Sequence, residues 1–306
     1  MFPTRLEGDT IMRARSDVRS MPQLMHEYPT IRSVSARPVV VPMDPPHRTA
    51  SGAVTDSPLV LVEIESSDGV TGNAIVFTYT RAALKPCAEL ITNLAALVVG
   101  DPLAPLEIEA KLSSRCRLLG TQGLVGMAIA GIDMAAWDAL ARGLDQPLAL
   151  LLGGDTKPIR AYGAVGYDGP EDSAAAAASW AERGFGGVKA KIGYPTVDED
   201  IEVIRAMRAA VGDDVVIMVD YNQSLTPVEA SHRLAALETE KIAWVEEPVL
   251  AHDFAGHASV ARQARVPIQC GENWWGVLDL EHAIDAGASD YVMADVMKIG
   301  GVTGWQ

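Results

Sequence analysis

The hydrophobic and polar positions change their period near the middle of the chain. Short alternating runs in the first part predict three β-strands over residues 34–41, 59–65 and 70–77, separated by the turn signals Asp44-Pro45-Pro46 and Ser67-Asp68-Gly69. Apolar residues at helical spacings then predict helices over residues 81–99, 105–115 and 122–143. Strands followed by helices are typical of an α+β unit.

After Gly153-Gly154, short apolar runs begin to alternate with amphipathic helical stretches. One such stretch, residues 198–211, has apolar residues at spacings of three and four and ends at Gly212. Repeated strand–helix units indicate parallel β-strands with right-handed crossovers. No Gly-x-Gly-x-x-Gly phosphate loop follows a strand here, which favours a (β/α) barrel over a doubly wound sheet. We expect the barrel strands over residues 159–165, 187–192, 215–220, 242–246, 266–271 and 290–295.

The predicted fold is therefore α/β, with an α+β capping domain over residues 31–155 and a (β/α) barrel domain over residues 156–306. Residues 1–30 lack sustained periodicity, and we expect a poorly ordered extension there. A closed barrel needs eight strands and only about six are expected, so we interpret the barrel as incomplete at its C-terminal side. A six-stranded open barrel would expose two sheet edges and part of its apolar interior.

Composition and charge exclude several classes of partner. The chain has 25 Lys and Arg against 40 Asp and Glu, a net charge of −15, which argues against nucleic acid as a partner. The longest uncharged stretch, residues 118–132, is too short to span a membrane, and the N-terminus lacks the apolar core of a secretory signal. The three cysteines have no metal-ligand spacing and suit buried free thiols. We expect a cytoplasmic protein.

Charged and polar residues recur where the predicted barrel strands end, which is where barrel enzymes carry their catalytic groups. Asp220, Glu246 and Glu272 are spaced at equal intervals of 26 residues, one strand–helix unit each. Three carboxylates brought to one point repel each other unless a cation lies between them, and oxygen ligands of this kind suit Mg²⁺. No His or Cys occupies these strand ends, which argues against zinc.

Lys189 and Lys191 are separated by one residue, so both side chains of the strand point to the same side, into the barrel mouth. A lysine beside a second lysine and a divalent cation loses its proton more easily and can act as a base. A metal and a lysine base are suited to removing the proton next to a carboxylate and to stabilising the resulting enediolate. Any one of these charged residues alone is explained as a solvated strand edge or a helix cap. With Asp295 at the end of the last expected strand, however, five consecutive strands end in such residues, which favours a catalytic site.

These residues and their surroundings resemble the enolase superfamily, and within it the mandelate racemase subgroup of the mandelate racemase/muconate lactonizing enzyme family. The resemblance runs from about Ile31 to the end of the chain. It rests on residues 130–138 in the first domain and on residues 188–195, 218–224, 244–248, 271–274 and 297–305 in the second. Sites of this superfamily combine Mg²⁺ with a Lys or His base.

The resemblance implies a role for each matching residue. It implies that Asp220, Glu246 and Glu272 bind Mg²⁺. It also implies that Lys191 is the base on one face of the substrate, and that Lys189 contacts the substrate carboxylate and favours the neutral form of Lys191. Asn222 is then expected to approach the α-hydroxyl, and Asp295 to orient a histidine base on the opposite face. That histidine belongs to a seventh strand, beyond Gln306, and His282 falls on a predicted helix instead. Lys298 is an alternative base for the opposite face.

The resemblance also bears on the substrate, a small-molecule carboxylate. Tyr79 matches a pocket tyrosine, which favours an apolar or aromatic substrate group. Ala164, however, replaces a substrate-binding serine. His47 and Arg48 add polar groups in a loop expected over residues 44–54. Three functions follow: racemisation of a 2-hydroxy acid, dehydration of an acid sugar by the same enediolate chemistry, or an inactive fragment that lacks the second base. Relatives imply a homo-oligomer, often an octamer.

Overall fold

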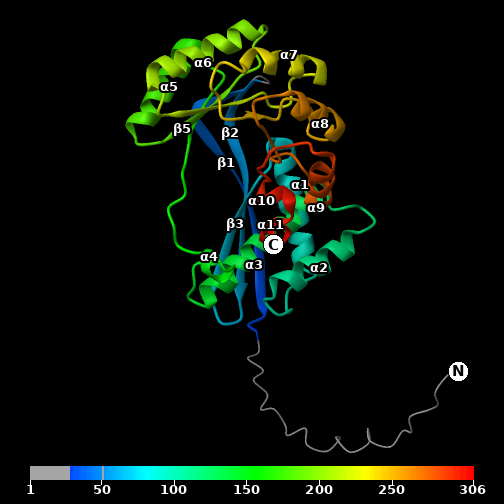
Figure 1. Ribbon diagram of the computed structural model, residues 1–306. Helices are drawn as coiled ribbons and strands as arrows, with labels where there is room; N and C mark the ends of the chain where they lie inside the picture. The colour runs from blue at the N-terminus through cyan, green and yellow to red at the C-terminus, as the bar shows by residue number, and fades with distance from the viewer. Residues whose placement is uncertain (1–27, 50–51) are drawn as a thin grey trace, which may run out of the picture.

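A computed structural model describes residues 28–49 and 52–306. Its two parts follow each other along the chain, an antiparallel sheet with helices and then a parallel sheet with helices (Figure 1). This is the predicted arrangement of a capping domain and a barrel domain. The expectation for residues 1–30 concerns a segment that lies almost wholly outside the described residues.

The capping sheet is the predicted three-stranded meander, with strands β1 (Ile31–Thr49), β2 (Gly52–Ser66) and β3 (Thr71–Phe77) in that order. The predicted turn at Asp44-Pro45-Pro46 is wrong, because β1 continues to Thr49 and pairs with β2 again from His47. Of the loop expected over residues 44–54, residues 44–49 and 52–54 belong to the two strands, and residues 50–51 lie outside the described residues. The register shifts between Pro42 and His47. An irregularity of this kind accommodates prolines, which have no N–H for the ladder, inside a long strand.

Four helices follow the sheet: α1 (Arg81–Ala95), α2 (Pro105–Cys116), α3 (Gly123–Gly143) and the short α4 (Leu148–Leu151). Helix α3 lies so close to the sheet that a Cβ on Gly72 would come within 2.2 Å of the carbonyl oxygen of Ala135. By length and apolar composition α3 could cross a membrane, but 72% of its apolar window is buried in the fold. It is the central core helix of the capping domain.

The second domain contains, in the described residues, a six-stranded parallel sheet in the order β4 to β9. The strands are β4 (Gly163–Val165), β5 (Gly187–Lys191), β6 (Val216–Asp220), β7 (Val245–Glu246), β8 (Ile268–Cys270) and β9 (Tyr291–Val292). The helices are α5 (Gly169–Glu182), α6 (Val197–Val211), α7 (Pro227–Leu237), α8 (Phe254–Gln263) and α9 (Gly276–Ala286), followed by the short α10 (Val296–Ile299) and α11 (Gly301–Trp305). All six predicted strands are present, but several are shorter than the apolar runs. The prediction of a strand from residue 159 is wrong because Ile159 is 86% exposed and β4 begins only at Gly163.

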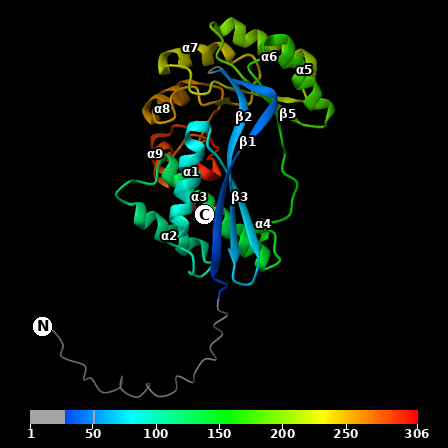
Figure 2. The ribbon, with the colours of Figure 1, turned by 180° about the vertical axis from the view of Figure 1, so that it is seen from behind.

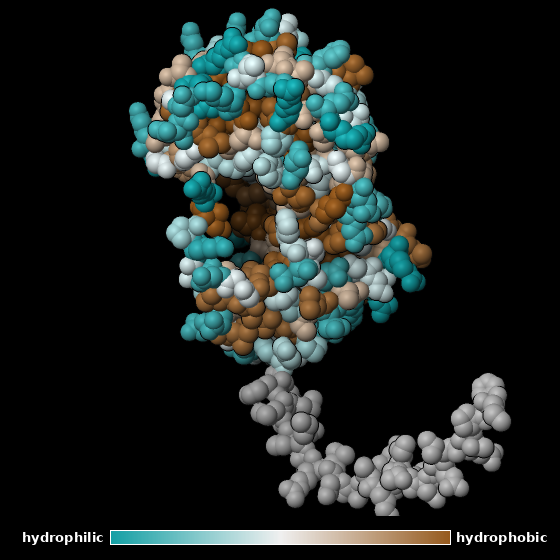
Figure 3. All heavy atoms as spheres, viewed as in Figure 1, coloured by the Kyte–Doolittle hydropathy of each residue, from teal (hydrophilic) through white to brown (hydrophobic). Residues whose placement is uncertain are grey.

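The parallel sheet is curled. Tyr162, just before β4, and Tyr291, in β9, both place their rings about 6 Å from the ring of Trp244, at 5.9 and 6.1 Å. These two tyrosines come from the two ends of the strand order, so their meeting on one face shows that this face is concave. The space-filling view shows a hollow between the barrel domain and the capping domain with hydrophobic residues on its inner wall (Figure 3).

Helices α10 and α11 bind the barrel domain to the capping domain, where they lie against α3 (Figure 2). Asp133 of α3 is fully buried and accepts hydrogen bonds from the backbone N–H of Thr303, at 3.1 Å, and from its hydroxyl. The Trp137 indole donates to the same hydroxyl at 2.9 Å. Because α10 directly follows Asp295, this contact fixes one side of the barrel mouth against the capping domain.

The buried histidine of α8 predicts how stability depends on pH. His257 is 1% exposed, neither ring nitrogen has a hydrogen-bond partner within the described residues, and burial lowers its pKa to about 4 from an ordinary 6.5. The unfolded chain therefore binds a proton that the folded chain rejects, and the free energy of unfolding falls as the pH drops from 6.5 toward 4, by at most ~3 kcal/mol.

The variant His257→Leu removes the titrating ring, so its stability should depend less on pH across this window. Urea titrations at pH 7, 5.5 and 4.5 measure the difference. The matched control is His282→Leu, on the surface of α9, which should keep the wild-type slope. Parallel curves for wild type and His257→Leu would contradict the assignment.

Candidate active site

Three charged residues at the ends of neighbouring strands lie side by side. Lys191 of β5 is in register with Asp220 of β6, and Asp220 is in register with Glu246 of β7. The carboxylates of Asp220 and Glu246 are fully buried. The pairing of parallel strands thus places acids that are 26 residues apart in sequence next to each other at one edge, as predicted.

Both lysines contact these carboxylates. The Lys189 ammonium lies 3.0 Å from Asp220 Oδ2 and 2.7 Å from both carboxylate oxygens of Glu246, while Lys191 Nζ donates to Asp220 Oδ2. Their side chains are only 10% and 12% exposed. Two ammonium groups and two carboxylates therefore form one nearly dry ion cluster, with Lys189 in the position of a shared cation.

The cluster changes the proton affinity of its members. Burial raises the pKa of Glu246, and the neighbouring Asp220 charge raises it further, while Lys189 opposes this shift. Burial also works against ionisation of Asp220, but the two lysines outweigh it and hold the pKa of that carboxyl below its ordinary value. Burial lowers the pKa of Lys189, and the two carboxylates outweigh it and raise that pKa. The cluster therefore favours the charged forms of Asp220 and Lys189, whereas it disfavours the charged form of Glu246 in spite of the Lys189 contact.

Residues that follow the strand ends adopt a strained backbone. Asn222, Gln223 and Glu247 all have positive φ angles, of 45°, 64° and 37°. Asn222 donates from its backbone N–H to Asp220 Oδ1 at 2.7 Å and from its amide to Oδ2 at 3.2 Å, and its own Oδ1 has no hydrogen-bond partner in the described part of the chain. Strained, locally hydrogen-bonded residues of this type concentrate at functional sites.

A second polar chain lies one step further along the strand order. Lys298 of α10 is 3% exposed and donates to Asn273 Oδ1 at 2.6 Å, and the Asn273 amide donates to Glu247 Oε2 at 2.6 Å. Burial raises the pKa of Glu247 to about 7, helped by the charge of Glu272. Burial lowers the pKa of Lys298, which acidic neighbours including Glu272 oppose. Glu272 itself is half-buried and belongs to this group rather than to the Lys189 contacts.

Tyr79 and Asp295 lie next to this second chain. The Lys298 ammonium lies 4.3 Å from the centre of the Tyr79 ring, and the Tyr79 hydroxyl is 3.5 Å from Asp295 Oδ2. Burial and the Asp295 charge raise the pKa of Tyr79. The capping domain therefore contributes Tyr79 to the site, and Lys298 stacks on it instead of pointing to solvent.

The C-terminal end of β1, up to Thr49, also reaches the barrel mouth (Figure 1). The backbone N–H of Tyr167 donates to the Arg48 carbonyl at 3.0 Å, and the Arg48 guanidinium lies 3.7 Å from Asp168. Burial lowers the pKa of His47, as do the positive charges of Lys191 and, more weakly, Lys189. His47 is therefore close enough to feel both lysines electrostatically, and the hairpin forms part of the site wall.

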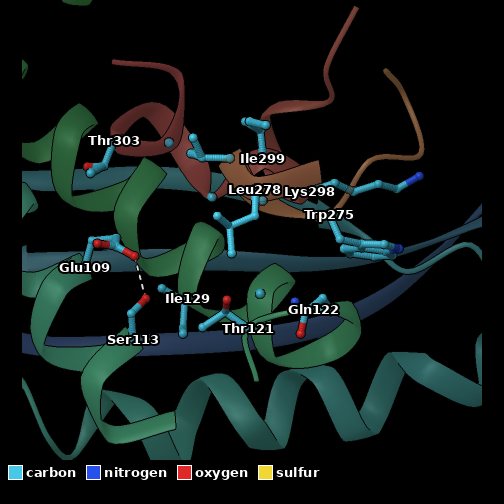
Figure 4. A pocket seen from close by; sticks show the side chains of 15 residues that line it. Glu109, Ser113, Thr121, Gln122, Ile129, Trp275, Leu278, Lys298, Ile299 and Thr303 are labelled. Atoms are coloured by element: carbon cyan, nitrogen blue, oxygen red, sulfur yellow. Dashed lines mark hydrogen bonds between the residues drawn. The ribbon is translucent and has the colours of Figure 1, made fainter. Parts of the chain in front are cut away.

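A cavity of about 350 Å³ lies between the two domains. Glu109, Ser113 and Ile129 line it from α2 and α3, and Trp275 and Leu278 line it from the α9 side (Figure 4). The Lys298 amine extends past Trp275, away from Glu109 and Ser113. The cavity is thus separate from the ion cluster and belongs to the domain interface.

The residues of the ion cluster fit a hard divalent cation. Asp220 and Glu246 are buried carboxylates that already share one cationic group, the Lys189 ammonium. In residues 28–49 and 52–306, no three His, Cys, Asp or Glu side chains form a ready metal cluster. The lysines contact the two carboxylates instead, and the convergence of Asp220, Glu246 and Glu272 on one ion stays a prediction. Oxygen donors alone suit Mg²⁺.

Comparison with known families now identifies the chain. Residues 31–153 match the model described as the N-terminal domain of mandelate racemase/muconate lactonizing enzymes, and residues 172–306 match the enolase C-terminal domain-like model. The chain belongs to the mandelate racemase/muconate lactonizing enzyme family. Both the resemblance inferred from the motifs and the fold of an enolase-superfamily protein are thereby confirmed.

Several members of the family are similar to the chain. L-talarate/galactarate dehydratase of Salmonella typhimurium is 33% identical over 82% of this chain, and D-galactarolactone cycloisomerase of Agrobacterium fabrum is 32% identical over 85% of it. The matched region spans 64% and 69% of the length of these two relatives. An enolase from Bradyrhizobium, solved in complex with magnesium and mandelic acid, is 42% identical with a TM-score of 0.87, over 92% of this chain and 78% of that one.

Sequence reasoning singled out the strand-end residues but gave no role to Glu247 or Asn273. A signal for this pair was present, because Glu247 and Asn273 are also 26 residues apart, the spacing that relates Glu246 to Glu272. Sequence reasoning also overlooked Asp200, a buried carboxylate in the middle of a charged run on α6. In that run it looks no different from its exposed neighbours.

The ion cluster predicts a link between Mg²⁺ and stability. The variant Lys189→Met removes the shared ammonium and leaves Asp220 and Glu246 facing each other in a buried site. Without metal, the free energy of unfolding should fall by ~3 kcal/mol, and Mg²⁺ should restore much of it because the ion replaces the missing charge. Thermal unfolding with EDTA and with a Mg²⁺ series measures both effects.

The matched control is Lys241→Met, which breaks an ion pair of 3.5 Å with Asp213 whose side chains are about three-quarters exposed. It should change stability by less than ~0.5 kcal/mol. If Lys189→Met is as stable as the wild type in EDTA, or gains no more from Mg²⁺ than the wild type does, then Lys189 is not the cation that balances these carboxylates.

Proposed function

We propose that this protein is a Mg²⁺-dependent enzyme that removes the proton α to the carboxylate of a 2-hydroxy acid, with racemisation as the outcome. The observation that carries the proposal is the ion cluster, in which Lys189 and Lys191 meet Asp220 and Glu246 at the ends of three neighbouring strands. The acids bound or acted on by the relatives support the substrate class, because mandelic acid and the sugar diacids are all 2-hydroxy acids.

In this proposal the Lys191 ammonium first loses a proton to solvent, and the neutral amine then takes the α-proton on its Nζ. The electron pair of the broken C–H bond moves into the carboxylate, which becomes an enediolate. The Lys189 ammonium, almost buried, faces the negative charge that develops on the carboxylate oxygens, where a low dielectric strengthens its effect. Mg²⁺ held by Asp220, Glu246 and Glu272 would supply Lewis-acid stabilisation of the same charge. Asn222 would bind the α-hydroxyl through its unpaired Oδ1.

The opposite face of the substrate is assigned to Tyr79 and Asp295. Racemisation returns a proton on the face opposite to Lys191, so a second acid must act there. Tyr79 and Asp295 contact each other at 3.5 Å, and Asp295 would orient the histidine that the family resemblance implies as the donor of this proton. Lys298 is the alternative donor, since burial lowers its pKa and its ammonium lies against the Tyr79 ring.

A second candidate function is dehydration of an acid sugar, in which the enediolate expels a β-hydroxyl. His47 favours it, because this polar side chain lies within electrostatic reach of both lysines. Ala164 is in register with Lys189 and exposes its methyl group on the same face of the sheet, which leaves room for a polyhydroxylated chain. The names of the dehydratase relatives point to the same reaction.

We propose further that the protein works in the cytoplasm as a homo-oligomer. The relatives are named as enzymes that act on small-molecule acids, which supports the location, and the family resemblance implies the assembly. Size-exclusion chromatography with light scattering tests the oligomer directly.

The proposed reaction predicts proton–deuterium exchange at the α-carbon of the substrate. A panel of mandelate, lactate and six-carbon sugar diacids is incubated in D₂O with Mg²⁺ and followed by NMR. The wild-type chain should exchange the α-proton of at least one acid, and Lys191→Ala should lose at least ~1,000-fold of that rate because it removes the base. Lys157→Ala, on the surface, serves as the matched lysine control and should retain the rate.

The product separates the two outcomes. Racemisation yields the opposite enantiomer, whereas dehydration yields a 2-keto-3-deoxy acid that reacts with semicarbazide. A folded, Mg²⁺-supplied wild type that exchanges none of these acids would refute the proposal.

A further inference from the structure

Asp200 is a fully buried carboxylate that the proposed reaction does not use. It lies in the first turn of α6, and both of its oxygens are saturated with hydrogen bonds. Oδ1 accepts from the backbone N–H groups of Gly193 and Tyr194, each at 2.9 Å. Oδ2 accepts from the Tyr221 hydroxyl at 2.9 Å and from the Arg233 guanidinium at 2.7 Å. Four donors from three separate segments thus converge on one side chain.

The segments that Asp200 joins are those that carry the reacting groups. Gly193 is the second residue after Lys191, and Tyr221 directly follows Asp220. Between them the strand ladder continues, with the backbone N–H of Ile192 donating to the Asp220 carbonyl at 2.9 Å. Asp200 therefore ties the chain just beyond Lys191 to the chain just beyond Asp220, from the side of the sheet opposite to the ion cluster.

The burial of this carboxylate is not explained by the needs of α6 itself. The N-terminus of α6 is already capped by Thr196 and Glu199, which exchange hydrogen bonds in a capping box. An isolated buried carboxylate is costly and needs a partner. Arg233 supplies that partner and also donates to the carbonyls of Tyr194 at 2.8 Å and Pro195 at 3.1 Å. The whole arrangement holds the turn of residues 193–195, in which Gly193 has a φ of +110°.

We propose that Asp200 is a positioning residue for the reaction: through Gly193 and Tyr221 it sets where Lys191 and Asp220 stand relative to each other. The expected effect on kcat rests on the proposed function, and the expected effect on the Kd for Mg²⁺ rests on the proposed role of Asp220 as a metal ligand. Asp200 does not touch the substrate. Its loss acts by loosening two strand ends whose side chains must stay in one geometry, and small displacements of reacting groups are costly.

Two variants test this proposal. Asp200→Asn keeps the shape of the side chain but removes the negative charge that binds Arg233. It also puts an NH₂ group, itself a donor, in place of an oxygen that accepts hydrogen bonds. Tyr221→Phe removes one hydroxyl and leaves the Arg233 pair intact, so it is the milder change. For a substrate identified by the exchange panel, kcat for exchange should fall 10–100-fold in Asp200→Asn and less in Tyr221→Phe, with KM within twofold of wild type.

A second measurement does not depend on activity. Titration calorimetry with Mg²⁺ alone should show a Kd several-fold higher in Asp200→Asn than in the wild type, because Asp220 is displaced. If the wild type exchanges no acid, the proposed function fails, but the Mg²⁺ titration still decides whether Asp200 positions Asp220. The matched control is Glu240→Gln, which removes the charge that pairs with Arg205; Arg205 lies on α6, as Asp200 does. This variant should leave kcat and the Mg²⁺ Kd unchanged.

The proposal is overturned if both variants, folded as judged by circular dichroism, keep kcat and the Mg²⁺ Kd within twofold of wild type. It is also overturned if the whole loss of activity is accounted for by a smaller folded fraction. If Asp200→Asn does not fold, Tyr221→Phe decides the question by the same two measurements.

Discussion

The site depends on one electrostatic constraint: carboxylates buried side by side must be balanced by cations in the same dry space. The register of the parallel strands places Asp220 next to Glu246, and the two carboxylates cannot move apart unless the pairing of β6 with β7 breaks. Lys189 balances both of them in this structure. The cost of burying these four charges is met by the geometry of the cluster, since each ion would be unstable alone.

This constraint explains why several contacts from other elements hold the strand ends that carry the ion cluster. Helices α10 and α11 fasten the Asp295 side of the mouth to the capping domain through Asp133 and Thr303. On the other side, the buried Asp200 carboxylate joins the turns that follow β5 and β6. The strained residues Asn222 and Glu247 sit between these two supports. The charged groups of the site are therefore held in place from two sides, by the contact of α11 with Asp133 and by the hydrogen bonds of Asp200.

Most of the architecture could be predicted from sequence because period and spacing follow directly from burial. The capping meander, the six parallel strands and the equal spacing of Asp220, Glu246 and Glu272 were all visible in the chain. Strand ends were less predictable, as Ile159 shows, because apolar character alone does not establish ladder pairing. The hairpin tip was misjudged because prolines at 45 and 46 signal a turn locally, whereas the register shift after Pro42 absorbs them.

The side-chain partnerships of the site were harder to predict for a physical reason. A charged residue has the same local pattern whether it meets solvent, a metal or another side chain, and only the three-dimensional fold decides which. Asp200 sits among acids on a helix, and nothing in that run distinguishes the buried one. Lys298 similarly has the sequence context of a helix lysine, although it is buried against Tyr79 and bound to Asn273. The roles of the individual site residues remain predictions for mutagenesis.

The way the hairpin tip meets the barrel has an evolutionary consequence. The contact at Arg48 uses its carbonyl oxygen and the backbone N–H of Tyr167, groups that almost every residue possesses. The Arg48 side chain adds an ion pair of 3.7 Å with Asp168, but this pair is largely exposed and contributes little, so docking of the hairpin depends mainly on the backbone contact. Mutations at position 47 can change what lies near the lysines without releasing the hairpin, so new substrate preferences can arise while the catalytic residues stay unchanged.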